Sequence, residues 1–273
     1  MYQEALDLVG YHIGGSAQAS FDLKMLADQG VKWAQIFLSN PKRMVPPSTS
    51  PMLNGDNTKH MNLVVHGPFT VNTLNKEEKL WSWTLNHMLE LAKICHHYGI
   101  KHIVTHTGSA KEATRDEAYY SLLAFANLWA TKTKGFDVTL CFETCAGSKN
   151  GQKMGTVPMV YTMCKNLKHP RIKICFDSEH SYASGFDISD EAKVSKLMEQ
   201  VGVVHLNAIP DNVVFGKHLD RHSETLIKDS KEGPDPIVNI AKKAVELNIP
   251  MILEGKDYSL METDRHYIAE RLG

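Results

Sequence analysis

The chain has 273 residues, of which 42% are hydrophobic and 22% charged, and its formal net charge is -1. This balance is typical of an ordinary globular protein and excludes any global attraction to nucleic acid, to an anionic membrane or to acidic substrates. No apolar run approaches the roughly 20 residues that span a bilayer, and residues 1–10 lack the pattern of a signal peptide. The five cysteines are odd in number and form no C-x-x-C pair, which predicts free thiols. We therefore expect a cytoplasmic protein without a membrane partner, with a nuclear or virus-associated location as the alternatives.

Short apolar runs alternate with longer amphipathic segments along the whole chain. Eight runs can be counted, at residues 6–14, 31–38, 62–67, 101–108, 137–144, 171–177, 201–207 and 249–255. Several are apolar nearly throughout and rich in Val, Ile and Leu, as strands buried on both faces are. The alternation predicts a parallel sheet built from βα units.

The segments between the runs carry the signals that start and stop helices. One helix is expected to begin at Asn75 and to end before Gly99, a second runs from Thr114 to Gly135, and a third begins at Ser189. Eight strands, each followed by a helix, predict an α/β fold with one (β/α)8 TIM barrel domain over residues 1–273. A doubly wound open sheet is the alternative. Residues 40–60, rich in Pro, Ser and Asn, are the one irregular connection.

In six consecutive runs, from the third to the eighth, the apolar stretch is followed at its end by a residue type that binds transition metals or moves protons. These residues are His66, His106, Glu143, Asp177, His205 and Glu254. Barrel enzymes place their chemistry at the carboxyl ends of the strands, where the loops meet at one mouth. Burying so many ionisable groups together is costly unless cations lie between them. Imidazoles and carboxylates without cysteine suit Zn²⁺ or Mn²⁺.

Two further pieces extend this set of candidate ligands. His180 follows Asp177 by three positions, so the loop after the strand can bring it to the same mouth. Asp220 and His222 are two apart, so on an extended segment both side chains point to one side. A surface loop is the alternative explanation for this pair. Nine candidate ligands are more than one or two zinc ions can take at four or five ligands each.

The motifs that hold these residues resemble the endonuclease IV family, the trinuclear zinc apurinic/apyrimidinic endonucleases of the xylose-isomerase-like barrel superfamily. The resemblance extends from "YHIGG" to "LEGKD" and is specific in "CFETCAG", "CFDSEHSYASGFD", "VHLNA" and "LDRHS". It implies three Zn²⁺ ions per chain, with Mn²⁺ as an alternative in one position. By resemblance, one zinc is held by His66 and His106, and the second by Asp177, His205 and Glu254. Glu143 bridges these two ions. The third zinc is held by His180, Asp220 and His222.

The resemblance also implies an activity, that of a deoxyribonuclease IV-type hydrolase in base excision repair. Such an enzyme cuts the phosphodiester 5′ to an abasic site in duplex DNA and leaves a 3′-hydroxyl and a 5′-deoxyribose phosphate. Clustered zinc lowers the pKa of bound water from about 15.7 to near 7 and stabilises charge on the phosphate. Glu254 and Glu143 would be the catalytic carboxylates, with Glu254 helping to position the attacking hydroxide. A monomer is expected.

Contacts with DNA are expected from residues of the loops around the mouth. The candidates are Asn40, Lys42 and Arg43 in "SNPKRM", Phe69 as a flat ring that fills the base stack, and Lys217 and Arg221 beside the third metal pair. An ordinary solvated basic loop is the alternative for "SNPKRM". Loops 41–61 and 223–236 depart from the family pattern, which affects lesion preference rather than the metal ligands.

Two other functions compete with the nuclease. A metal-dependent sugar isomerase or epimerase of the same superfamily would use one Mn²⁺ or Mg²⁺ and would have no use for Asp220 and His222 as a third site. A non-catalytic module that binds DNA or metal would be expected to have lost at least one ligand, and all nine are present.

Overall fold

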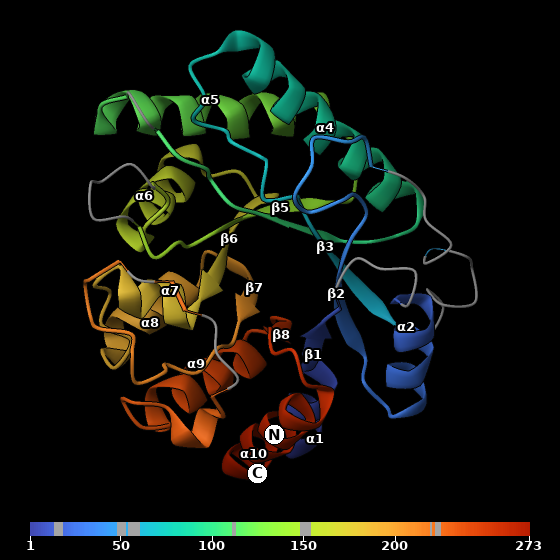
Figure 1. Cartoon of the computed structure of the whole chain (residues 1–273), viewed down its shortest axis with the longest axis vertical. Coiled ribbons are helices and arrows are strands. Elements are labelled where there is room, and N and C mark those ends of the chain that lie inside the picture. The colour runs from blue at the N-terminus through green and yellow to red at the C-terminus, as the bar shows by residue number, and fades with distance from the viewer. Residues whose placement is uncertain are drawn as a thin grey trace.

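Eight parallel strands close into a barrel in the computed structural model (Figure 1). The strands are β1 (Val9–His12), β2 (Trp33–Phe37), β3 (Asn62–His66), β4 (His102–Thr105), β5 (Thr139–Glu143), β6 (Ile172–Asp177), β7 (Val201–His205) and β8 (Met251–Leu253). Each strand pairs with its neighbour in sequence, and β8 pairs with β1. The closed parallel barrel confirms the predicted fold class. The structure describes residues 1–13, 19–47, 53, 61–110, 113–147, 154–218, 220–221 and 225–273.

The interior of the barrel is built in layers because side chains alternate between the two faces of a strand. One buried layer consists of Val64, Val104, Cys141, Cys175, Val203 and Ile252, and Trp33 packs against it. Two residues further along each of these six strands come the six polar residues of the predicted strand ends. The small apolar layer therefore supports a polar layer at the carboxyl ends of the strands.

Strand β1 contributes a glycine to the interior where β2 contributes a tryptophan. A Cβ atom on Gly10 would lie 2.1 Å from the carbonyl oxygen of Trp33. Only glycine permits this close approach of β1 to β2.

Helices surround the barrel on all sides (Figure 1). They are α1 (Tyr2–Leu8), α2 (Ala19–Asp28), α4 (Glu78–His97), α5 (Arg115–Lys132), α6 (Val157–Leu167), α7 (Ser178–Ala183), α8 (Glu191–Met198), α9 (Asp235–Glu246) and α10 (Tyr258–Leu272), with a 3₁₀ turn, η2 (Ile227–Asp229). The two termini lie side by side at the foot of Figure 1, where α1 meets α10. All five cysteines are buried, and none forms a disulfide with another, as predicted. None of the helices described is both long and apolar enough to cross a membrane.

The predicted helix starts are right for one helix and displaced for two. Thr114 caps α5 and forms a capping box with Glu117. In contrast, α4 begins at Glu78 rather than at Asn75, because the Asn75 side chain accepts a hydrogen bond from the amide of Glu77 and closes a turn before the helix.

The third predicted start, Ser189, is also too early, in this case by one position. Asp190 caps α8 by accepting a hydrogen bond from the amide of Lys193, whereas the hydroxyl of Ser189 donates to Asp187. Short polar side chains compete for such turns, so neighbouring Ser and Asp residues are hard to rank from sequence.

Candidate metal centre

The carboxylate of Glu143 lies at the centre of the polar layer. It is buried, and its Oε2 lies 3.0 Å from Nε2 of His66 and 3.3 Å from Nε2 of His106. Two ligand atoms held ~2.0–2.2 Å from one tetrahedral zinc are roughly 3.3–3.6 Å apart. These three residues form one group whose ligand atoms all lie within 4.8 Å of one another.

A second group faces the other oxygen of Glu143. Nδ1 of His205 lies 3.3 Å from Oε2 of Glu254, 3.4 Å from Oε1 of Glu143 and 3.8 Å from Oδ2 of Asp177. This buried nitrogen makes no hydrogen bond to any described residue. A buried nitrogen without a hydrogen bond, facing three carboxylates, is the arrangement that a divalent cation would complete. The residues therefore fit a metal ion.

Amide side chains hold these ligands from behind. Oε1 of Gln35 accepts a hydrogen bond from Nε2 of His205 at 2.8 Å. Nδ2 of Asn207 donates to Oδ2 of Asp177 at 2.8 Å and to Oε2 of Glu254 at 3.2 Å. Such partners orient metal ligands and raise their affinity. Sequence reasoning missed both amides, although a glutamine in the middle of an apolar strand was a signal for Gln35.

His180 belongs to a short helix and not to the loop that was predicted. Asp177 caps α7 by accepting a hydrogen bond from the amide of His180 at 2.7 Å. Nδ1 of His180 lies 3.0 Å from the carbonyl oxygen of Thr144, so the other ring nitrogen is available to a different partner. That nitrogen, Nε2, lies 3.5 Å from Oδ2 of Asp220. The third predicted ligand of this site, His222, lies outside the described residues.

Glu179 is a further carboxylate beside His180. The set of predicted ligands does not include it. It is fully buried, and its Oε2 lies 3.9 Å from Nε2 of His180. Its Oε1 accepts a hydrogen bond from the amide of Arg221 at 3.3 Å. Asp177, Glu179 and His180 form a group that can hold a metal ion. The sequence held a signal for Glu179, because this acidic residue lies directly before the predicted ligand His180.

Protons take the place of a cation in the metal-free centre. Burial raises the pKa of Glu143, but the imidazoles of His106 and His205 outweigh it and hold that pKa well below its usual range. Burial lowers the pKa of His205, but Glu254 and Glu143 outweigh burial and raise it to about 9. An incoming metal ion must displace this proton, so metal binding weakens in acid.

The imidazoles of His106 and His180 respond to different surroundings. Burial lowers the pKa of His106 to about 4, which leaves a neutral ring with a lone pair for a metal. Burial also lowers the pKa of His180, but Asp177 and Asp220 outweigh it and raise that pKa well above its usual value.

The centre opens into a cavity of about 640 Å³. Ligand candidates from all three groups line it, and its other walls are largely apolar. Those walls include Phe37, Phe69, Val71 and Met154. The side chain of His12, at the end of β1, also reaches the cavity. Sequence reasoning missed His12 because it examined the strand ends only from the third run onward. His12 stands at the end of the first run's strand in the same way.

The predicted DNA contacts lie on two sides of this cavity. Phe69 is 54% exposed, and its amide donates to the carbonyl oxygen of Pro41, which ties it to the loop that carries Asn40, Lys42 and Arg43. These three side chains are exposed.

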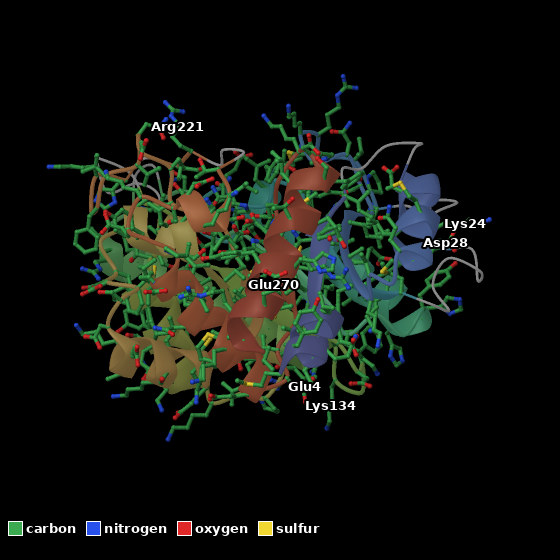
Figure 2. The ribbon with its side chains drawn as sticks, turned by 90° about the horizontal axis from the view of Figure 1, so that it is seen from below. Glu4, Lys24, Asp28, Lys134, Arg221 and Glu270 are labelled. Carbon is green, nitrogen blue, oxygen red and sulfur yellow. The ribbon has the colours of Figure 1, made fainter. Side chains whose placement is uncertain are left out.

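On the other side, Lys217 and Arg221 are exposed on the loop after β7, which also carries Asp220. Figure 2 shows Arg221 projecting at the opposite end of the molecule from Glu4 and Lys134, which lie near the starts of strands. The contact of these rim side chains with DNA stays a prediction.

The family model described as "Xylose isomerase-like TIM barrel" matches residues 23–269. A protein of Malacoplasma penetrans named "Probable endonuclease 4" is 33% identical over 201 residues, which are 71% of this chain and 67% of that protein. The chain belongs to the endonuclease IV family. A protein of the same name from Mycoplasma pneumoniae is 28% identical over 221 residues, 79% of this chain and 75% of that protein.

Solved structures agree on the fold of this endonuclease IV family member. The crystal structure of endonuclease IV from Thermus thermophilus has a TM-score of 0.75 at 20% identity and covers 97% of this chain and 98% of its own. D-psicose 3-epimerase from Clostridium cellulolyticum has a TM-score of 0.71 at 10% identity, with 97% of each chain covered. Nucleases and epimerases thus share this barrel, so the fold alone does not assign the reaction.

Proposed function

We propose that this chain is a zinc-dependent apurinic/apyrimidinic endonuclease that hydrolyses the phosphodiester 5′ to an abasic site in duplex DNA. The observation that carries the proposal is the convergence of three groups of imidazoles and carboxylates on one cavity. Three groups are more than a one-metal isomerase needs. The curated relatives named "Probable endonuclease 4" support the nuclease over the epimerase, which is not proposed.

The assigned ligands follow the three groups. Glu143 would bridge the ion held by His66 and His106 and the ion held by Asp177, His205 and Glu254, because its two oxygens face the two sets. His180 and Asp220, with His222, would hold the third ion. Zinc, when bound, lowers the pKa of water and neutralises charge that develops on a phosphate.

The protein side chains would orient the reactants. Glu254 lines the cavity, and Gln35 and Asn207 each hold one of its oxygens, so its carboxylate can orient water for in-line attack and accept a proton. No protein nucleophile is required. This makes Glu254 the first candidate for a catalytic residue and Glu143 the second, through its position between two ions.

The rim would recognise the damaged duplex. Lys42, Arg43, Lys217 and Arg221 offer positive charge for phosphates on both sides of the cavity. The exposed ring of Phe69 contacts His66 and His106 edge-on, with centroids 5.9 and 5.7 Å away, and so lies at the mouth. A ring there can fill the space that a flipped-out abasic nucleotide leaves in the stack.

The decisive experiment uses a duplex oligonucleotide with a single tetrahydrofuran abasic analogue. The zinc-loaded protein is expected to make one nick on the 5′ side of the analogue and to leave a 3′-hydroxyl, whereas a chelator should abolish cleavage. The matched intact duplex should remain uncut. Elemental analysis should give about three zinc ions per chain. Absence of cleavage by fully loaded protein, or a single bound manganese together with sugar epimerisation, would refute the proposal.

A further inference from the structure

One amide side chain touches two candidate ligands of the metal centre and a third residue that lines the cavity. Gln35 on β2 is fully buried. Its Nε2 lies 2.8 Å from Nδ1 of His12 and 3.1 Å from Oε1 of Glu254, and its Oε1 lies 2.8 Å from Nε2 of His205. The three contacts use the whole hydrogen-bonding capacity of the amide nitrogen and one lone pair of its oxygen.

The orientation of this amide follows from Glu254. An ionised carboxylate only accepts hydrogen bonds, so the NH₂ end of Gln35 must face it. The reverse orientation would place two oxygens 3.1 Å apart in a buried site. The carbonyl end of Gln35 therefore faces His205 and accepts its hydrogen bond. Nε2 of His205 must carry a hydrogen, so Nδ1, which faces the carboxylates, is the nitrogen that remains for a metal ion.

The same amide determines which ring nitrogen carries the hydrogen in a second imidazole. The remaining hydrogen of the NH₂ group points at Nδ1 of His12, which must accept it. A neutral His12 therefore carries its hydrogen on Nε2. His12 lines the cavity, and its Nε2 makes no hydrogen bond to any residue in the described ranges. The ring is held in place edge-on to Phe37, with centroids 5.1 Å apart.

We propose that Gln35 is a positioning residue that fixes the tautomers of His205 and His12 together. His205 thereby presents Nδ1 to a metal ion, and His12 presents an N–H group to an oxygen of the DNA backbone in the cavity. The first half of this inference concerns the metal centre alone. The second half rests on the proposed function, because it needs an oxygen-rich substrate beside His12.

Two substitutions separate the two tasks of Gln35. Gln35→Met keeps a similar side-chain length but neither donates nor accepts. Gln35→Glu keeps an oxygen for His205. Beside Glu254 the new carboxyl group shares one proton with that carboxylate, so it has no hydrogen left to donate to His12. Histidine-selective ¹⁵N NMR of the zinc-loaded protein reads the tautomer of each ring directly. We expect hydrogen on Nε2 of both rings in the wild type, and in Gln35→Glu a shift of the His12 hydrogen to Nδ1 with His205 unchanged.

Zinc affinity provides the second measurement. Competition with a chromophoric chelator should show a loss of affinity of about ten- to hundredfold for one of the bound ions in Gln35→Met, the usual effect of removing a partner of a metal ligand. The exposed Gln29→Met serves as the matched control and should bind zinc as the wild type does. Thermal melting of the metal-free proteins identifies a variant that fails to fold.

Several results would overturn the inference. Hydrogen on Nδ1 of His12 in the wild type would do so without any variant, as would an unchanged His12 tautomer in Gln35→Glu or unchanged zinc affinity in folded Gln35→Met. These measurements use no DNA. A protein that shows the expected tautomers but does not cut abasic duplex would contradict the proposed function and leave the role of Gln35 intact.

Discussion

At Glu254, substitution by glutamine removes the charge of the side chain and keeps its shape. Oε2 of Glu254 lies 3.3 Å from Nδ1 of His205, and its side chain is 14% exposed to the cavity. In Glu254→Gln an oxygen remains near the metal position, but the side chain can no longer accept a proton. We expect zinc content to stay close to the wild-type value, while cleavage of abasic duplex falls by about 10²- to 10⁴-fold.

Metal analysis and single-turnover cleavage on the same preparation test this expectation. Glu90→Gln, an exposed substitution on α4, is the control and should leave both quantities unchanged. Wild-type cleavage by Glu254→Gln would remove its role in handling the proton, whereas loss of zinc would show that it acts mainly as a ligand.

Glu179 is the residue-scale test of the third group. It fastens the segment that carries Asp220 by accepting the amide hydrogen of Arg221, and it adds a carboxylate beside His180. In Glu179→Ala we expect the affinity for the third zinc ion to fall about ten- to hundredfold, because both effects weaken that site. The other two ions should remain bound.

A chelator titration that resolves successive zinc ions measures the effect. The wild type should lose its ions at similar chelator strength, and the variant should lose one ion much earlier. Equal titration curves would mean that Glu179 contributes only to packing. The exposed Glu246→Ala on α9 controls for the loss of a negative charge.

At the scale of elements, the strand ends were predictable and the helix after β6 was not. The two-residue period of a strand places Val64 and His66, or Val203 and His205, on the same inner face, so a polar residue that ends a buried run must point into the barrel. Helix α7 follows β6 without any turn residue. Asp177 serves both as a ligand candidate and as the N-cap of α7, and a sequence pattern assigns it only one role.

Helix α10 fixes the position of η2 through one buried carboxylate. Oδ1 of Asp264 accepts a hydrogen bond from the amide of Ile227 at 2.8 Å. Burial, opposed by this bond, raises the pKa of Asp264 from 3.8 to about 6. The folded chain therefore holds this proton more tightly than the unfolded chain does. Stability from this group is fully present below pH ~4 and is lost as the pH rises to ~6, a change of up to about 3 kcal/mol.

Asp264→Asn keeps the accepting oxygen but cannot ionise. We expect its unfolding free energy to lack this loss between pH 4 and pH 6, so the variant should be more stable than the wild type at pH 7. Urea unfolding of both proteins with a chelator present measures the difference at each pH. An identical pH dependence in the two proteins would contradict the prediction, and Asp264→Ala shows the separate cost of losing the hydrogen bond to Ile227.

For the whole molecule, sequence periodicity favoured the closed barrel over an open sheet and predicted the convergence of the strand ends, but it did not predict the hydrogen bonds between distant strands. Gln35 meets His205 and Glu254 only because β1 pairs with both β2 and β8, which brings β2 near the end of the chain's last strand. Contacts between residues so far apart in the sequence leave no local pattern. The contact between the two ends of the chain likewise results from closure of the barrel and leaves no local pattern in the sequence.

Arg265 on α10 is a buried side chain that joins the last helix of the barrel to its first elements. It is 4% exposed, and its guanidinium donates to the carbonyl oxygen of Leu6 on α1 at 3.0 and 3.2 Å and to that of Gly30 after α2 at 3.1 Å. Arg265→Met leaves these carbonyl oxygens without their charged donor. We expect a loss of at least about 3 kcal/mol in unfolding free energy, since two carbonyl oxygens lose a charged donor and each such hydrogen bond contributes ~1.5–3 kcal/mol.

The loss from Arg265→Met should appear as a lower urea midpoint in a single transition, because a barrel whose first strand detaches loses two ladders at once. Arg271→Met, on the same helix as Arg265, removes an exposed ion pair with Asp235 and should cost less than about 1 kcal/mol. Zinc affinity of the folded Arg265→Met protein should be unchanged, because α1 precedes β1 and so lies at the end of the barrel opposite the strand ends that carry the metal centre. Equal midpoints for the two arginine variants would show that the hydrogen bonds of Arg265 contribute little to barrel closure.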